Sequence, residues 1–404
     1  MKQSILDKKN LVLGVCGAIA AYKSVALLRL LVKAGALVRV VMTENAGRFV
    51  GALTFEALSR NKVCSDLFDF HDTAAVQHIQ WAQDADAVIV APATANTIAK
   101  LAHGIADDGL STFMLAVTSP AMICPSMNAN MYASEAVQDN LEILRRRGYA
   151  IVEPEAGELA CGTIGPGRLP EPEYILDRLH ALLMPKDLSG YHFLITAGPT
   201  HEPIDPVRYI SNRSSGKMGY AIARAAEMRG ADVTLVAGPT ILAPPNNVRL
   251  VPVTTAAQMA VAVSGLFEKA DILIKSAAVA DYTPERTNPH KIKKRQKSRA
   301  LPLKPTEDIL KQAAQQKHGQ VMVGFAAETQ HLDRYAAEKL ASKRLDLIVG
   351  NLVGPADSGF EVDTNRVNLY FKEGPRESLG LMPKREVAHL ILDRVVDLLK
   401  GKSR

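Results

Sequence analysis

A strand–turn–helix–strand pattern occurs twice in this chain, and it constrains the fold more than any other feature. The first copy has an apolar run at 11–15, a helical pattern that ends at Gly35, and a second apolar run at 37–43. The second copy has an apolar run at 192–196, a helix from about Lys217 to Gly230, and a strand at 232–237. Short apolar runs that alternate with helical patterns are typical of βαβ units with a parallel sheet.

Further buried strands are predicted in both halves of the chain, at 86–94, 121–127, 271–281, 321–329 and 345–351. A length of 404 residues exceeds what one ordinary domain core organises. Pro185 and Gly190 interrupt the pattern just before the second copy begins. We therefore predict an α/β protein with two Rossmann-like parallel-sheet domains in tandem, at residues 1–187 and 188–404.

Composition excludes several classes of protein. Hydrophobic residues make up 47% of the chain and charged residues 22%, the balance of a globular protein without a membrane span. The N-terminus has no apolar signal segment, and the four cysteines have no CxxC spacing. We therefore expect a cytoplasmic protein with no disulfide framework and no zinc site.

The basic segment at 291–299 leaves several interpretations open. It carries much of the formal charge of +6, and a nucleic-acid surface, a solvated loop and a site for small polyanions are all compatible with it. No nucleic-acid-binding motif accompanies it, so we do not expect a nucleic-acid partner.

Neither βαβ opening carries the fingerprint of a dinucleotide-binding domain. Both lack GxGxxG, and no acidic residue directly ends the strand after the helix in either half. This argues against the alternative of a large NAD-dependent dehydrogenase.

The loops after the strands of the first half suit a phosphorylated ring system. Gly17 precedes a helix whose free N–H groups favour a phosphate, and Thr43 follows the next strand. The loops at 91–100 and 124–132 are rich in small hydroxyl and amide side chains. His78 is isolated, and a lone histidine is more often structural than catalytic. Cys161 lies in a segment rich in glycine and proline, where we expect a mobile flap with a thiol that donates a proton.

Five segments of the first half, taken in order, resemble the flavin-dependent phosphopantothenoylcysteine decarboxylases: GAIAAYK (17–23), QHI (77–79), APATANT (91–97), PSMNANM (125–131) and ACGTIGPGR (160–168). The resemblance implies FMN, which oxidises the substrate thiol so that the neighbouring carboxylate leaves as carbon dioxide. It implies that His78 assists these steps, that Asn128 binds the carboxylate and that Cys161 donates the proton. It further implies FMN contacts from Gly17, Ala18, Ile19, Thr43, Thr94, Asn96 and Met127.

The second half carries a long segment at 196–223, TAGPTHEPIDPVRYISNRSSGKMGYAIA, followed by SAAVADYTP at 276–284. These motifs resemble the phosphopantothenate–cysteine ligases, and the whole chain resembles the bacterial bifunctional decarboxylase–ligases of coenzyme A biosynthesis. The resemblance implies that CTP activates the carboxylate of 4′-phosphopantothenate as an acyl-cytidylate, which cysteine then attacks. In that scheme Asn212 handles the acyl-cytidylate, Lys291 serves the second half-reaction, and Arg208 contacts the phosphate of phosphopantothenate.

The same resemblance implies a CTP site that is assembled from several segments of the second half. Its residues are Ser276, Ala277, Ala278, Asp281, Lys291, Glu307, Asp308, Ile309, Leu310, Phe325, Lys339 and Lys343. We expect Mg²⁺ with the triphosphate, although its ligands are not visible in the sequence. The resemblance also implies a homo-oligomer, a dodecamer of trimers joined by dimers.

Three segments depart from the family pattern: Cys16 beside the phosphate-turn glycine, the run Asp107-Asp108-Gly109, and Glu307 in place of a proline. Two alternatives remain open at this stage. One is a partner-binding flavoprotein that has lost catalysis, and the other is a flavin prenyltransferase fused to an unrelated domain.

Overall fold

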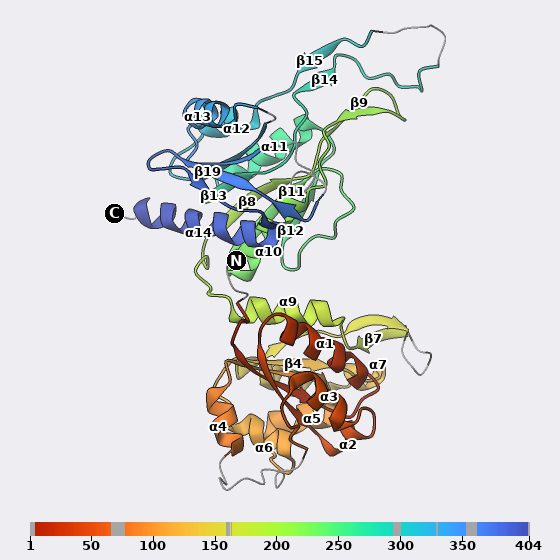
Figure 1. Ribbon diagram of the computed structural model, residues 1–404. Helices are drawn as coiled ribbons and strands as arrows, with labels where there is room; N and C mark the ends of the chain where they lie inside the picture. The colour runs from red at the N-terminus through yellow and green to blue at the C-terminus, as the bar shows by residue number, and fades with distance from the viewer. Residues whose placement is uncertain are drawn as a thin grey trace. The chain divides into compact units, whose positions relative to one another are not determined.

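The computed structural model describes residues 5–65, 77–158, 162, 164–293, 300–328, 330–352 and 362–402 (Figure 1). The chain divides into two compact units, Met1–Met184 and Pro185–Arg404, which are described here one at a time. Within the described ranges, every helix is too short or too polar to cross a lipid bilayer.

The first unit is built on a five-stranded parallel sheet. Its strand order is β2-β1-β3-β4-β5, with β1 at Asn10–Val15, β2 at Leu37–Met42, β3 at Ala87–Ala93, β4 at Ala121–Pro125 and β5 at Ala150–Ile151. All residues of β3 are buried, as expected for a strand with helices on both faces of the sheet.

Two apolar clusters, one on each face, hold helices against this sheet. One contains side chains of α1, α3 and α9, and the other contains side chains of α5, α6 and α8. The helices are α1 Ala21–Lys33, α2 Glu44–Gly47, α3 Ala52–Ser59, α4 Gln77–Asp84, α5 Ala95–His103, α6 Gly109–Ala116, α7 Ala129–Ala133, α8 Glu135–Arg146 and α9 Pro172–Leu183. A separate antiparallel hairpin pairs β6 (Glu155–Glu158) with β7 (Ile164–Arg168).

The second unit contains an eight-stranded mixed sheet. Its order is β12-β11-β8-β13-β16-β17-β19-β20, and the first six of these strands run parallel. β19 pairs antiparallel with both β17 and β20. The strands are β8 His192–Ala197, β11 Asp232–Ala237, β12 Arg249–Pro252, β13 Ile272–Lys275, β16 Val321–Glu328, β17 Leu347–Leu352, β19 Val367–Phe371 and β20 Glu377–Ser378.

Helices cover both faces of this second sheet (Figure 1). One face packs against α10 (Lys217–Met228) and α14 (Lys384–Lys402), and the other against α11 (Ala256–Phe267), α12 (Ile309–Gln315) and α13 (Leu332–Ser342). Three small ladders complete the unit: β9 (His201–Pro203) with β10 (Tyr209–Ser211), β14 (Tyr282–Pro284) with β15 (Leu303–Pro305), and β18 (Thr364–Asn365) with β21 (Met382–Pro383). β9, β14 and β15 lie beyond one end of the main sheet (Figure 1).

The fold class predicted from the sequence is confirmed, and the structure differs from the prediction in several details. The strand expected at 271–281 ends at Lys275, because the following residues form a loop that bonds to the end of β8. The antiparallel strands β19 and β20 were not predicted. Residues 164–168 were expected on a flexible flap, but they form strand β7 and pair with β6.

Candidate active sites

The carboxyl ends of β1 and β3 form the first candidate site. In the order β2-β1-β3, the chain leaves β1 and β3 toward opposite sides, which opens a crevice between these two strands. The turns beyond the strands are bonded together: the Thr43 N–H donates to the Val15 carbonyl (3.0 Å), and the Ser126 N–H donates to the Ala93 carbonyl (2.9 Å). The seven residues for which the sequence predicts FMN contacts all follow these strands: Gly17, Ala18, Ile19, Thr43, Thr94 and Met127 lie in the turns, and Asn96 lies in the first turn of α5.

The amino end of α1 at this edge suits a phosphate. The helix has no acidic residue in its first turn, and its N-cap residue, Ala20, makes no side-chain capping bond. Backbone N–H groups at such an end favour an anion, and the macrodipole adds to this preference. The residues present therefore fit the phosphate of a flavin nucleotide.

Gly17 has a structural role that its position in the sequence did not reveal. A Cβ atom at this position would lie 2.5 Å from the Asn45 Cβ and 2.7 Å from the Asn45 carbonyl carbon. The glycine therefore lets the turn after β1 pack directly on α2, which begins after Thr43.

The cysteines described at and near this edge are not reactive groups. The Cys16 thiol donates to the Thr97 hydroxyl at 3.2 Å, and burial raises its pKa to about 11. Burial also raises the pKa of Cys124 well above its usual range. Both thiols therefore stay protonated at neutral pH, and the unusual residue beside Gly17 is a packed side chain rather than a nucleophile.

Asn128 lies at the turn between β4 and α7, where the β6–β7 hairpin is anchored. Its Oδ1 accepts a bond from the Asn130 N–H (2.8 Å), which makes it the N-cap of α7. The Met127 N–H donates to the Gly167 carbonyl (3.1 Å), and a Cβ at Gly167, where φ is 152°, would lie 2.2 Å from the Met127 carbonyl oxygen. The two hairpin strands on either side of residues 159–163 are thus fixed beside Asn128.

Two predicted catalytic residues of the first unit lie at the margins of what the structure describes. His78 is the second residue of α4, but its side chain lies outside the described part. Cys161 lies outside the described residues, between β6 and β7.

The unusual run Asp107-Asp108-Gly109 forms a local ion-pair and capping network. Lys100 Nζ lies 2.6 Å from an Asp107 carboxylate oxygen and 2.7 Å from one of Asp108. The Asp108 side chain also accepts from the Ser111 N–H (2.8 Å) in a capping box at the start of α6. This departure from the family pattern therefore fixes the α5–α6 connection.

The second candidate site lies where β8 and β13 end. Two buried hydroxyls that the sequence analysis overlooked join the loops after these strands: Thr196 Oγ1 accepts from the Ala277 N–H (3.2 Å), and Thr200 Oγ1 accepts from the Ala280 N–H (3.0 Å). Asn212 Nδ2 donates to the Ala278 and Val279 carbonyls at 3.3 and 3.0 Å. The structure thus brings the predicted residues Asn212, Ala277 and Ala278 together.

Arg208 is bonded to the basic loop rather than extended into open solvent. Its guanidinium pairs with the Asp205 carboxylate, and it donates to the Ile292 carbonyl at 2.9 Å. The Ile292 N–H in turn donates to Asp205 (3.2 Å), and the Arg208 guanidinium holds the Asp205 pKa well below its usual range. Lys291 is exposed and directly precedes Ile292, whose backbone these bonds hold in place.

Three lysines come together beside the end of β13. Lys339 Nζ donates to the Phe325 carbonyl at 2.7 Å, and Lys343 Nζ pairs with Asp308 Oδ2 at 2.8 Å. Lys275, which the sequence analysis did not single out, donates to the Ala277 carbonyl at 3.0 Å. Burial, together with the charges of Lys339 and Lys343, lowers the Lys275 pKa to about 8.

The remaining predicted nucleotide residues differ in what their side chains can reach. Ser276 and Asp281 flank the alanines in the loop after β13. Ile309 and Leu310 are buried in the apolar cluster under α12, so only their backbone is available to a ligand. The exposed Glu307 carboxylate accepts from Gln312 Nε2 at 3.0 Å, which connects this departure from the family pattern to α12.

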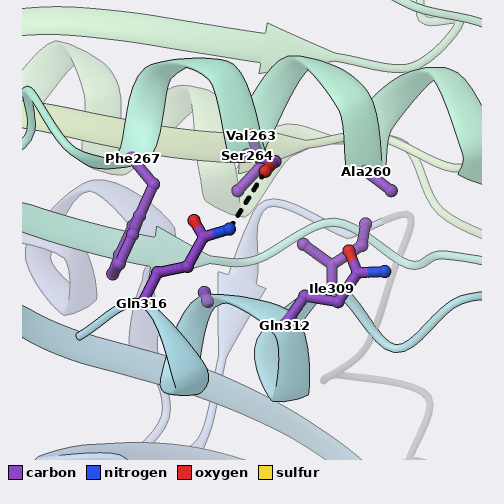
Figure 2. Close-up of a pocket in the computed structure, with 8 residues that line it drawn as sticks. Ala260, Val263, Ser264, Phe267, Ile309, Gln312 and Gln316 are labelled. Carbon is purple, nitrogen blue, oxygen red and sulfur yellow. Dashed lines mark hydrogen bonds between the residues drawn. The ribbon is translucent and has the colours of Figure 1, made fainter.

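A small pocket between α11 and α12 does not have room for a nucleotide (Figure 2). Its volume is about 10 Å³, which is at the lower limit for one water molecule. Gln316 Nε2 donates to Ser264 Oγ across it at 3.4 Å, as the dashed line in Figure 2 marks. The candidate site is therefore the open edge at the strand ends.

Metal ligands do not gather at either site among the residues that the structure describes. No group of three or more His, Cys, Asp or Glu side chains within them could hold an ion.

Comparisons with known proteins cover both halves of the chain. Residues 2–184 match the family model described as flavoprotein, and residues 188–399 match the model described as the DNA/pantothenate metabolism flavoprotein C-terminal domain. The coenzyme A biosynthesis bifunctional protein CoaBC of Bacillus subtilis (strain 168) is 49% identical over 400 residues, which covers 98% of each chain. The protein of the same name from Escherichia coli (strain K12) is 45% identical over 404 residues, 99% of each chain.

A solved structure of the C-terminal domain of a CoaBC protein is also similar. It is 42% identical in sequence, covers 54% of this chain and 99% of its own, and has a TM-score of 0.47. The full-length relatives confirm the resemblance that the sequence motifs indicated.

Proposed function

Because the chain belongs to the family of coenzyme A biosynthesis bifunctional proteins CoaBC, we propose that it catalyses two consecutive steps of that pathway. The second unit joins 4′-phosphopantothenate to cysteine at the expense of CTP. The first unit decarboxylates the product, 4′-phosphopantothenoylcysteine, to 4′-phosphopantetheine with FMN. The observation that carries this proposal is the match of full-length relatives across both units, at 49% and 45% identity.

In the first unit, the chain's residues bind the flavin and orient the substrate. The uncapped amino end of α1 holds the FMN phosphate, and the turns after β1, β2, β3 and β4 contact the rest of the cofactor. Bound FMN supplies two-electron redox chemistry at the substrate thiol. Asn128 binds the substrate carboxylate from its place at the start of α7, and His78 assists from α4.

Cys161 is the proton donor of this first site in our proposal. It follows β6 in the sequence and precedes β7, and both strands pair beside Asn128. A thiol there can protonate the carbon that the leaving carboxylate vacates. Replacement of this thiol by a hydroxyl therefore separates decarboxylation from completion of the product.

In the second unit, the loops after β8 and β13 receive the nucleotide. Ala277 and Ala278 let a base lie against the backbone, and Asp281, Asp308 and Phe325 are available around it. Lys339 and Lys343 neutralise phosphates, and Lys291 stabilises the charge that develops when the cysteine amine attacks the acyl-cytidylate. Arg208 contributes through its bond to the neighbouring Ile292.

Three finer features belong to the same proposal. Mg²⁺ enters with CTP, bound mainly by the triphosphate, since triphosphate chemistry requires charge balance. The enzyme works in the cytoplasm on small-molecule substrates. It assembles as a homo-oligomer, and the family resemblance suggests a dodecamer.

A coupled assay on the purified chain tests the proposal. We expect a yellow protein that releases pyrophosphate when CTP and 4′-phosphopantothenate are present, releases CMP only when cysteine is present as well, and then releases carbon dioxide. Greater activity with ATP than with CTP would refute the nucleotide assignment, and a colourless protein that does not take up FMN would refute the flavin assignment.

We expect Cys161→Ser to release carbon dioxide but to stall at an oxidised intermediate. The measurement compares carbon dioxide with 4′-phosphopantetheine by mass spectrometry, and CMP release from the same protein serves as the control. An undiminished yield of 4′-phosphopantetheine would contradict the role of Cys161.

A further inference from the structure

Lys275 occupies a place in the second site that neither the sequence motifs nor the family resemblance assigned. It is the last residue of β13 and pairs in register with Gly324 of β16, next to Phe325. By the alternation of side chains along a strand, it shares the sheet face of Leu273, whose side chain packs in the cluster under α11, α12 and α13. Its ammonium therefore emerges beside the helices that carry Lys339, Lys343 and Asp308.

The three ammonium groups have fewer carboxylate partners than charges. In the described part of the chain, Lys343 is paired with Asp308, whereas Lys275 and Lys339 donate to the backbone carbonyls of Ala277 and Phe325. A carbonyl accepts a hydrogen bond but does not neutralise a charge. The cluster therefore holds positive charge that is not balanced at short range.

Charged groups of two helices and of one loop act on Lys275. Lys339 of α13 and Lys343, the C-cap residue of that helix, disfavour its charged form, and Asp308 at the start of α12 and Asp281 after β13 favour it. Lys339 is subject to the same repulsion by Lys343, and Glu328 at the end of β16 opposes the effect. Burial and repulsion together outweigh the carboxylates, so the pKa of Lys275 is lowered to about 8 and that of Lys339 is lowered as well. An anion that binds among the three lysines would remove the repulsion.

We propose that Lys275 is a further nucleotide-binding residue of the ligase site, and that its ammonium joins those of Lys339 and Lys343 on the phosphate chain of CTP. This inference rests on the proposed ligase function. The competing interpretation is that Lys275 only closes the end of its own strand through the bond to the Ala277 carbonyl.

Kinetics of Lys275→Met separate the two interpretations. Methionine keeps the unbranched stem in the apolar cluster but removes the charge. Loss of one charge-assisted contact is expected to raise KM for CTP about tenfold or more, with a smaller change in kcat. Lys269→Met is the matched control, because Lys269 is exposed and precedes β13 at the opposite edge of the sheet, and we expect its KM for CTP to stay unchanged.

Proton uptake on binding of CTP provides a test that does not depend on turnover. With a pKa of about 8, Lys275 is only partly protonated at pH 8 in the free protein, and a bound polyanion raises that pKa. Calorimetric titration with CTP alone, at pH 8 in two buffers of different ionisation enthalpy, should therefore show proton uptake by wild type. Lys275→Met should take up less.

Lys275→Arg is the rescue variant. A guanidinium stays charged at all accessible pH values. We therefore expect it to bind CTP more tightly than Lys275→Met does, and its affinity should decline less than that of wild type between pH 7 and 9.

The outcomes distinguish this inference from the proposed function. If wild type does not bind CTP, the proposed ligase function itself fails. If wild type binds CTP, but Lys275→Met binds it equally well with the same proton uptake, Lys275 has only the structural role. Thermal unfolding of each variant identifies any that does not fold, and in that case the arginine variant and the pH dependence of wild type decide.

Discussion

Gly17 packs the turn after β1 against α2, and we propose that it also contacts FMN. Replacement by alanine would place Cβ 2.5 Å from the Asn45 Cβ, so either the turn after β1 or α2 must shift. We expect Gly17→Ala to destabilise the first unit by about 1–3 kcal/mol and to reduce its FMN content. The measurement combines thermal unfolding with the flavin-to-protein absorbance ratio.

Gly47 provides a matched control for this prediction. It lies in α2, and a Cβ there would meet nothing within 4 Å. Gly47→Ala should keep FMN and stability near those of wild type, because alanine is the better helix former. Equal flavin content in the two variants would contradict the packing role of Gly17.

Asp205 is a second residue whose effect reaches beyond its own position. Its side chain is inaccessible to solvent and bonds to Arg208 and to the Ile292 N–H, next to Lys291. We expect Asp205→Asn to lower kcat/KM of the ligase reaction roughly tenfold, because the loop that carries Lys291 loses a charge-assisted anchor. The decarboxylase rate with synthetic 4′-phosphopantothenoylcysteine should stay unchanged.

The ion pair also predicts how this anchor responds to acid. Arg208 depresses the pKa of Asp205 in the folded protein, so the anchor is fully present above the ordinary aspartate pKa and is lost only as the pH falls through the depressed value. Protonation of Asp205 should therefore cause no loss of ligase activity between pH 8 and 5.

The variant Asp333→Asn serves as a control for Asp205→Asn. It removes an exposed ion pair with Arg376, so its ligase activity should stay close to that of wild type.

Among the secondary-structure elements, the β6–β7 hairpin is the one that packs beside Asn128 at the first site. The Gly167 backbone lies against Met127, where a side chain cannot fit, and this contact fixes the hairpin beside Asn128. We expect Gly167→Ala to reduce the yield of 4′-phosphopantetheine at least tenfold, since a displaced hairpin misplaces the proton donor that we propose between its strands. CMP release by the ligase, measured in the same protein, should be unaffected, and a parallel loss of both activities would indicate general misfolding instead.

Elements with strong apolar runs could be predicted from the sequence, whereas those that depend on distant partners could not. β11 occupies the predicted range 232–237 because its buried residues form one continuous run. β13 is shorter than predicted, because the apolar residues after Lys275 form a loop whose N–H groups bond to Thr196 and Thr200. β19 and the edge strand β20 pair antiparallel, which depends on contacts with β17 that the local sequence does not reveal.

The candidate sites divide in the same way. Loops after strands could be located in advance, because parallel strands gather their carboxyl ends at one edge. The burial of Ile309 and the bonds of Arg208 to Asp205 could not be predicted from the sequence, because both depend on how distant segments pack. Lys275 was missed because a single lysine at the end of an apolar run gives no signal until Lys339 and Lys343 are seen beside it.

For the whole molecule, two compact units imply two separable unfolding events. Each ligand binds to one folded unit, so it should raise the melting temperature of that unit alone. At about a hundred times its dissociation constant, a ligand adds roughly 2.7 kcal/mol of stability. Differential scanning calorimetry of the full chain should show FMN and CTP acting on different transitions. A single transition that both ligands shift together would contradict this prediction.

The lysines on α13 have a consequence for incomplete chains. The turns that we propose for FMN lie before residue 132, but the proposed nucleotide site still lacks Lys339 and Lys343 until α13 and its C-cap residue have been made. A premature stop codon between Pro185 and α13 would thus leave a truncated protein. It could still bind FMN for the decarboxylation, but it could not make 4′-phosphopantothenoylcysteine, the substrate of that reaction. In a cell, such an allele should behave as a loss of the ligase alone, and a separately supplied second unit should complement it.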